Sequence, residues 1–147
     1  MFIDLDNFKH INDTLGHPVG DKLLCEVARR VTAVVRKSDI VARIGGDEFV
    51  LLLAEIHTPE ECTLILDRVL AVVSQELRIG ELLIHTSASI GVSLYPQDNV
   101  DPDTLLRHAD QAMYLAKQAG RNRIHWFDVA NDRQVQTSQQ TLARIKK

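Results

Sequence analysis

The sequence has few of the residues that build cysteine, histidine or serine sites. Its 2 cysteines, Cys25 and Cys62, fall in helix-like segments without a CxxC partner, which argues against a zinc site or a disulfide. We predict that both are small buried residues of a reducing compartment. The 6 histidines show no metal-ligand spacing, and no serine stands in a nucleophile-elbow pattern. Any chemistry must therefore come from carboxylates, amides and a few basic side chains.

Long apolar runs and a strong charge excess are also missing. No apolar segment is long enough to span a bilayer, and the first residues do not resemble a signal peptide. A net charge of -3 favours neither a general nucleic-acid surface nor a membrane surface. With 147 residues, 45% hydrophobic and 25% charged, the chain suits one globular domain. We expect no nucleic-acid partner and no membrane contact for this segment.

Hydrophobic periodicity and turn residues predict an alternation of strands and helices. The expected strands cover residues 1–5, 39–44, 48–54 and 124–127, and residues 82–95 are predicted as one long strand or hairpin arm. Within it, Gly91 indicates a bulge or a close backbone approach. The expected helices cover residues 8–15, 18–37, 58–76 and 104–119. This order predicts an α+β fold, a mostly antiparallel sheet covered by helices. We interpret the polar residues 129–147 as a linker or the start of a helix.

The segment from Arg43 to Leu53 is the most informative stretch. Two apolar runs joined by Gly45 and Gly46 predict a β-hairpin, and the glycines let a ligand approach the main chain closely. Asp47 and Glu48 then open a buried strand, where two acids are costly unless a cation meets them. On these residues alone, a solvated acidic turn and a metal site are equally good interpretations.

Asp4 ends the first expected strand and gives the hairpin acids a partner. If the strands are neighbours, Asp4, Asp47, Glu48 and the Leu5 carbonyl converge at one edge of the sheet. Such an oxygen-only set suits Mg²⁺ or Mn²⁺. A pair of these ions about 3.5–4 Å apart stabilises attacking and leaving oxygens in nucleotidyl transfer. A solvated strand end is the simpler alternative for Asp4 alone.

Several further residues suit a guanine nucleotide. Asn12 and Asp21 offer the amide and carboxylate that a guanine edge requires. Lys9 follows the first strand and can meet a phosphate. Lys117 and Arg121, four apart on one expected helix face, suit a triphosphate. Taken singly, each has a simpler interpretation as a cap, a turn residue or a basic helix end.

Several separated motifs, in the same order, resemble the GGDEF domain family, the diguanylate cyclases. The matching segments are residues 2–13, 16–21, 43–49, 89–93, 109–117 and 120–122. The resemblance covers about residues 1–128 and predicts a GGDEF domain over that range. It implies a palm-like (ferredoxin-like) fold similar to nucleotide cyclases and polymerases. It also implies that two GTP molecules are condensed into cyclic di-GMP, with release of two pyrophosphates, where two domains meet as a homodimer.

The resemblance also implies roles for individual residues. Two Mg²⁺ or Mn²⁺ ions per half-site would be held by Asp4, the Leu5 carbonyl, Asp47 and Glu48, the last two being catalytic. Guanine would be read by Asn12 and Asp21, and phosphates would be held by Lys9, Lys117 and Arg121. Gly45 and Gly46 would let phosphate and ribose approach. The family further implies a bacterial cytoplasmic location, including as part of a membrane-anchored sensor protein.

A second motif, Arg36 to Asp39, is similar to the RxxD inhibitory site of many family members. By resemblance, Arg36 and Asp39 would bind guanines of cyclic di-GMP, and Arg68 would add an arginine from a neighbouring domain. A basic helix end before a strand is the alternative.

One family segment, an Asp-x-Leu-Thr-Gly-Leu-x-Asn-Arg pattern upstream of the first strand, has no counterpart here. We therefore expect a GGDEF domain that lacks its usual N-terminal segment, fused in the full protein to sensor and EAL domains. The alternative function is a catalytically silent module that binds GTP or cyclic di-GMP.

Overall fold

The computed structural model describes residues 1–128, and the predicted linker at 129–147 lies outside them. The elements in chain order are β1 (Phe2–Leu5), α1 (Phe8–Leu15), α2 (His17–Val34), β2 (Ile40–Gly45), β3 (Glu48–Leu52), α3 (Pro59–Ser74), β4 (Leu77–Ile79), β5 (Leu82–Ile84), β6 (Ala88–Val92), α4 (Pro102–Gln118) and β7 (Arg123–Trp126). The α+β class and the helix-covered sheet are as predicted.

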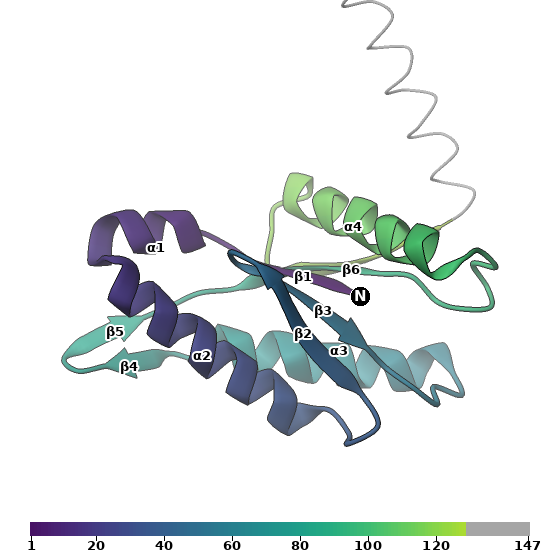
Figure 1. Ribbon diagram of the computed structural model, residues 1–147, viewed down its shortest axis with the longest axis horizontal. Helices are drawn as coiled ribbons and strands as arrows, with labels where there is room; N and C mark the ends of the chain where they lie inside the picture. Colours follow the sequence, from purple (N-terminus) through teal and green to yellow (C-terminus); the bar gives the residue numbers. More distant parts are fainter. Residues whose placement is uncertain (129–147) are drawn as a thin grey trace, which may run out of the picture.

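A five-stranded sheet forms the centre, in the order β2-β3-β1-β6-β7. The pairs β2–β3, β3–β1 and β1–β6 are antiparallel, and β6–β7 is parallel. In Figure 1 the sheet lies between α4 on one side and α2 with α3 on the other. The first strand is therefore central, although it comes from the N-terminal end of the chain.

Alternation along β1 decides which residues face which layer. Ile3 and Leu5 are buried in the main core, together with Phe49 and Leu51 of β3. The register pairs Asp4 with Glu48 and with Ser89, so all three lie on the opposite face. That face is the one α4 covers, and it carries the polar residues of the predicted site.

Gly91 allows α4 to lie close to the sheet. A Cβ atom at Gly91 would stand 1.9 Å from the Ala109 carbonyl oxygen and 2.2 Å from the Met113 amide nitrogen. The side of α4 that faces the sheet carries small side chains, and Ala109, Ala112 and Ala116 are buried there. The predicted close backbone approach at Gly91 is therefore confirmed.

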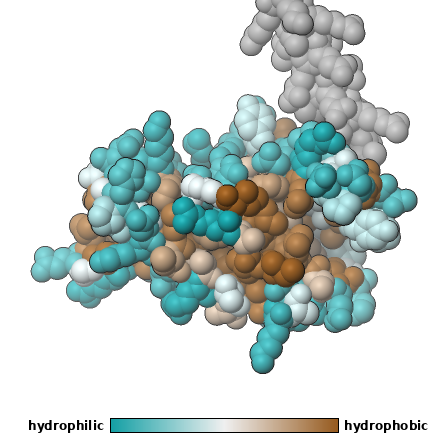
Figure 2. Space-filling model, viewed as in Figure 1, coloured by the Kyte–Doolittle hydropathy of each residue, from teal (hydrophilic) through white to brown (hydrophobic). Residues whose placement is uncertain are grey.

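Beyond α4 the same sheet face is apolar and exposed. α4 lies against β6, β7 and β1, whereas β2 and β3 extend past it. Ile40, Ile44 and Leu52 are 55%, 55% and 46% exposed. Figure 2 shows the corresponding apolar area beside α4.

Two predictions about this fold were wrong. Residues 82–95 are not one strand: β4 and β5 form a separate hairpin around Gly80, and β6 begins only at Ala88. Leu82 and Leu83 of that hairpin are exposed, so their apolar side chains were not a sign of a buried strand. Of the cysteines, Cys62 is buried but Cys25 is exposed.

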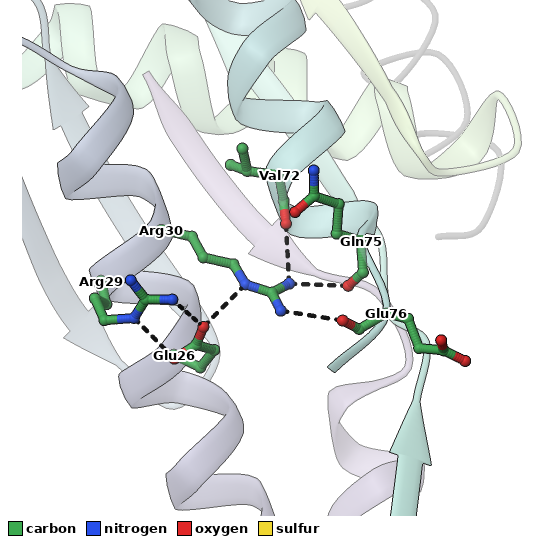
Figure 3. Close-up of polar contacts among 6 residues, drawn as sticks. All are labelled: Glu26, Arg29, Arg30, Val72, Gln75 and Glu76. Carbon is green, nitrogen blue, oxygen red and sulfur yellow. Dashed lines mark hydrogen bonds and ion pairs between the residues drawn. The ribbon is translucent and has the colours of Figure 1, made fainter. Parts of the chain in front are cut away.

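Arg30 joins α2 to the end of α3 (Figure 3). Its guanidinium donates to the carbonyl oxygens of Val72 (3.0 Å), Gln75 (2.9 Å) and Glu76 (3.1 Å). Carbonyls at a helix C-terminus have no partner within the helix, so Arg30 acts as a cap from outside. Glu26 in turn accepts a hydrogen bond from Arg30 (3.1 Å) and holds the guanidinium in place.

No helix in residues 1–128 is long and apolar enough to cross a membrane.

Candidate active site

The three predicted metal-binding acids lie where β1 ends and β3 begins, at one end of the strands of the central sheet. Asp4 stands opposite Glu48 in the β1–β3 ladder, and the Leu5 amide donates to the Asp47 carbonyl oxygen at 3.2 Å. The side chains of Asp4 and Asp47 are also in contact. The structure thus brings the end of β1 to the β2–β3 turn, as the sequence predicted.

Asp4 is the most perturbed acid of this group. Its side chain is only 4% exposed, and Oδ2 accepts a hydrogen bond from Lys117 of α4. The other oxygen, Oδ1, is buried without a partner. The pKa of Asp4 is raised to about 6: burial is the largest cause, Lys117 opposes it, and the neighbouring Asp47 acts in the same direction as burial.

The residues present fit a hard divalent cation. A buried carboxylate oxygen without a partner is costly, and a cation would satisfy it. Asp4, Asp47, Glu48 and the Leu5 carbonyl offer oxygen ligands only, which suits Mg²⁺ or Mn²⁺. Within residues 1–128, however, no three His, Cys, Asp or Glu side chains lie close enough to hold one ion. Water and substrate oxygens would have to complete the shell, as is usual for Mg²⁺.

A pocket of about 410 Å³ opens beside these acids. It lies between the end of β1, the start of α1 and the turn after α4. Its lining residues are Leu5, Asp6, Asn7, Phe8, Lys9, His10, Asp13, Asp47, Lys117 and Arg121. Five predicted residues line it and come together from four separate segments: Leu5, Lys9, Asp47, Lys117 and Arg121.

The first turn of α1 adds backbone donors to this pocket. Asn7 has φ +63° and does not cap the helix with its side chain. The first intrahelical bond of α1 runs from the Ile11 amide to the Asn7 carbonyl oxygen, at 3.0 Å. The amides of Phe8, Lys9 and His10 thus precede the helical ladder and are available to an anion.

The two basic residues predicted on one helix face do not share one. Lys117 lies in the last turn of α4, but α4 ends at Gln118, and Arg121 has φ +63°. Arg121 reaches the pocket from the turn between α4 and β7. Lys117, predicted to hold phosphate, is instead paired with Asp4 here.

Asn12 and Asp21 lie outside the lining of this pocket. The Oδ1 atom of Asn12 is buried without a partner, and a Cβ at Gly20 would stand only 1.8 Å from it. Asp21 is exposed near the start of α2. An unpartnered amide oxygen is an acceptor for a ligand N–H.

The hairpin glycines are open to a ligand. A Cβ at Gly45 or at Gly46 would have no neighbouring atom within 4 Å. Gly46 has φ +51°, a conformation that favours glycine. Arg43 Nε donates to the Gly46 carbonyl oxygen at 3.1 Å and fixes the turn.

Arg36 and Asp39 form hydrogen bonds with nearby backbone groups. Asp39 Oδ2 accepts from the Arg36 amide (2.8 Å), and Oδ1 accepts from the Ala54 amide (2.9 Å). The Asp39 side chain has no exposed surface, whereas the Arg36 side chain is 42% exposed. Arg36 also donates to the Ala54 carbonyl oxygen at 2.8 Å. Arg68 is exposed on α3.

Sequence reasoning missed Asp6, His10 and Asp13, which also line the pocket. Asp6 is buried and accepts three hydrogen bonds. Its spacing of two residues from Asp4 was a usable signal, because in an extended chain this spacing places both carboxylates on one side. For His10 and Asp13 the helical position alone gave no such signal.

Comparison with known proteins identifies the class of this fold and site. The family model described as "Diguanylate cyclase, GGDEF domain" matches residues 1–123. The chain therefore belongs to the GGDEF domain family.

The relatives are longer proteins. The chain is 42% identical over 146 residues to the bifunctional diguanylate cyclase/cyclic di-GMP phosphodiesterase MucR of Pseudomonas aeruginosa, covering 99% of this chain and 21% of MucR. It is 41% identical to the cyclic di-GMP phosphodiesterase NbdA of the same organism, covering 86% of this chain and 16% of NbdA. The chain thus spans about a fifth of the length of these relatives.

A solved structure agrees with the fold. The crystal structure of the GGDEF domain of TpbB from Pseudomonas aeruginosa matches with a TM-score of 0.84 and 41% identity. The match covers 87% of this chain and 80% of that one.

Proposed function

We propose that this chain is a diguanylate cyclase domain that condenses two GTP molecules into cyclic di-GMP and releases two pyrophosphates. The observation that carries the proposal is the unpartnered, buried Oδ1 of Asp4 near Asp47. Asp47 lines a pocket whose wall also contains Lys9, Lys117 and Arg121. Family membership supports the same reaction class.

The residues divide into two groups by what they would contact. Asp4, the Leu5 carbonyl, Asp47 and Glu48 would hold two Mg²⁺ or Mn²⁺ ions per half-site. When bound, such ions neutralise the charge on the phosphate oxygens and on the attacking oxygen. Lys9, Arg121 and the amides at the start of α1 would hold the β- and γ-phosphates. Lys117 would join them once a metal ion replaces it on Asp4.

In GTP the ribose links the guanine to the triphosphate, so the guanine and the ribose would lie on the same side of these phosphates. Asn12 Oδ1 would accept a hydrogen bond from guanine, and Asp21 would accept from its other N–H groups. Gly45 and Gly46 would leave room for the ribose. The 3′-hydroxyl oxygen of one GTP then attacks the α-phosphorus of the other, and the bond from that phosphorus to the pyrophosphate oxygen breaks. Asp47 or Glu48 would accept the hydroxyl proton.

The reaction needs a second copy of the domain, because each pocket holds one nucleotide. We therefore propose a homodimer, with cyclic di-GMP as product and as inhibitor at Arg36 and Asp39. The chain would work in the bacterial cytoplasm as one domain, residues 1–128, of a protein with sensor and EAL domains. MucR, with both activities in its name, supports such an arrangement.

The direct test is to incubate the purified protein with GTP and Mg²⁺ and to separate the nucleotides by chromatography. Cyclic di-GMP from the wild type, and none from Asp47→Ala, is the expected result. A dimeric wild type that makes no cyclic di-GMP, or an Asp47→Ala variant as active as the wild type, would overturn the proposal.

A second candidate is a silent module that binds GTP or cyclic di-GMP and regulates an attached domain. NbdA, named only as a phosphodiesterase, favours it, since it contains a similar domain. Calorimetry distinguishes the two: the module would bind GTP without turnover. Titration of cyclic di-GMP into wild type and Arg36→Ala tests the inhibitory site, and equal affinities would remove Arg36 from it.

A further inference from the structure

The buried carboxylate of Asp6 connects three parts of the chain. Asp6 is 3% exposed and follows β1 directly. Its Oδ2 accepts from Ser87 Oγ at 2.6 Å and from the Asn122 amide at 3.0 Å. Its Oδ1 accepts from Ser89 Oγ at 2.7 Å. None of the roles proposed above uses this side chain, although it lines the same pocket.

The Asn122 amide belongs to the turn that carries Arg121. Arg121 and Asn122 have φ +63° and +48°, a left-handed conformation that side-chain-bearing residues rarely adopt twice in succession. Such a conformation persists only where surrounding contacts hold it. The Arg121 amide donates to the Ala116 carbonyl oxygen at 3.0 Å, and Arg123 Nε donates to the Arg121 carbonyl oxygen at 3.0 Å. The hydrogen bond from the Asn122 amide to Asp6 ties this turn to the end of β1.

We propose that Asp6 is a positioning residue that fixes Arg121 over the pocket, at a constant distance from the metal-binding end of β1. Asp6 lies two residues after Asp4 on the same chain segment, so the carboxylate transmits the position of β1 to the turn. This inference rests on the proposed function, because it assumes that Arg121 contacts phosphate. It adds that the affinity contributed by Arg121 depends on Asp6.

Charge makes Asp6 suited to this task. Hydrogen bonds from backbone N–H groups to a carboxylate are stronger than those to a neutral acceptor. The two serine hydroxyls supply two further hydrogen bonds to the buried group, which makes the burial of a charge tolerable. A purely structural role would require only stable packing, whereas positioning also requires that Asp6 and Arg121 act on the same ligand contact.

A double-mutant cycle separates these two roles. The probe is the α,β-methylene analogue of GTP with Mg²⁺, which cannot release pyrophosphate, titrated by calorimetry. Arg121→Ala is expected to weaken binding about tenfold, since it removes a charged hydrogen bond. Asp6→Asn is expected to weaken binding at least threefold in the wild type but less than twofold in the Arg121→Ala background. The same factor in both backgrounds, or no weakening in a folded Asp6→Asn protein, overturns the inference alone.

Ser89→Ala is the matched control. It removes a hydrogen bond to Asp6 and leaves the bond to Asn122, so probe affinity should stay within twofold of the wild type. A wild type that does not bind the probe would overturn the proposed function itself. Hydrogen exchange gives a reading that needs no variant: the Asn122 amide of the wild type should exchange at least tenfold more slowly than in an unfolded chain. Unprotected exchange there overturns the inference.

Discussion

Lys117, near the end of α4, donates a hydrogen bond to Asp4, at the end of β1. The ammonium group occupies one oxygen of a carboxylate whose other oxygen is unpartnered. In the proposed metal site, Lys117 and a divalent ion would therefore compete for the same carboxylate.

Replacing Lys117 with methionine should destabilise the metal-free protein by about 1–3 kcal/mol, because a buried carboxylate loses its charged partner. Added Mg²⁺ should restore more stability to the variant than to the wild type, since the ion supplies the missing charge. Urea unfolding with and without Mg²⁺ measures both effects. Lys9→Met, at an exposed position, should change stability by less than about 0.5 kcal/mol. Equal responses of all three proteins to Mg²⁺ would contradict a metal site at Asp4.

Substitution of Asp39 should damage the fold before it affects any ligand. Both oxygens accept backbone amide hydrogen bonds in a fully buried setting, so Asp39→Ala should cost about 2–4 kcal/mol. Asp39→Asn keeps one strong acceptor and should lose less. Arg36→Ala, at a largely exposed side chain, should cost under about 1 kcal/mol. Thermal unfolding of the three variants checks this order. A stable Asp39→Ala protein would show that the turn between α2 and β2 does not depend on the Asp39 carboxylate.

Gly91→Ala should prevent stable folding, because the new methyl group would overlap backbone atoms of α4 that cannot move aside. We expect a loss of more than about 3 kcal/mol. Gly45→Ala is the control: its methyl group would meet no atom within 4 Å, so the melting temperature should hardly change. Circular dichroism melting curves measure both. If Gly45→Ala is stable yet loses activity, the loss reports the approach of a ligand to the hairpin.

Arg30 and Arg29 offer a comparison on one helix. Both contact Glu26, but only Arg30 also caps the end of α3, and the Arg29 side chain is 69% exposed. Arg30→Ala should destabilise by about 1–3 kcal/mol, and Arg29→Ala should destabilise clearly less. Urea midpoints of the two variants give the comparison. Equal losses would mean that the ion pair with Glu26, not the helix cap, is what Arg30 contributes.

The loss of folding stability at acid pH should depend on Glu26. Hydrogen bonding to Arg29, followed by that to Arg30, lowers the pKa of Glu26 from 4.5 to about 2. A carboxyl with a lower pKa in the folded state contributes stability that is present above pH 4.5 and is lost as the pH falls toward 2. Glu26→Gln should therefore flatten the dependence of unfolding free energy on pH in this window. A variant that keeps the wild-type slope between pH 4.5 and 2 would assign that slope to other carboxyls.

Much of the fold and part of the site follow from local patterns. The convergence of Asp4 with Asp47 and Glu48 was predictable, because a hairpin turn and a strand end meet wherever their strands pair. The contact between Lys117 and Asp4 was not, since 113 positions separate the residues and the contact depends on how α4 crosses the sheet.

Other features escaped prediction for different physical reasons. The β4–β5 hairpin was missed because the apolar Leu82 and Leu83 do not pack into the core. The spacing of Asp39 gave no sign that its carboxylate is buried and accepts hydrogen bonds from two backbone amides. Composition and spacing carry no information on which donors surround a side chain after folding.

The central position of β1 determines when the site can form during synthesis. Asp4 leaves the ribosome before both neighbours of its strand, since β1 pairs with β3, which ends at Leu52, and with β6, which ends at Val92. Pairings between distant segments form late, because the chain between them must first be ordered. The acid at the centre of the proposed chemistry therefore emerges before β3 and β6, and its strand lacks the second of these neighbours until the chain through Val92 has been translated.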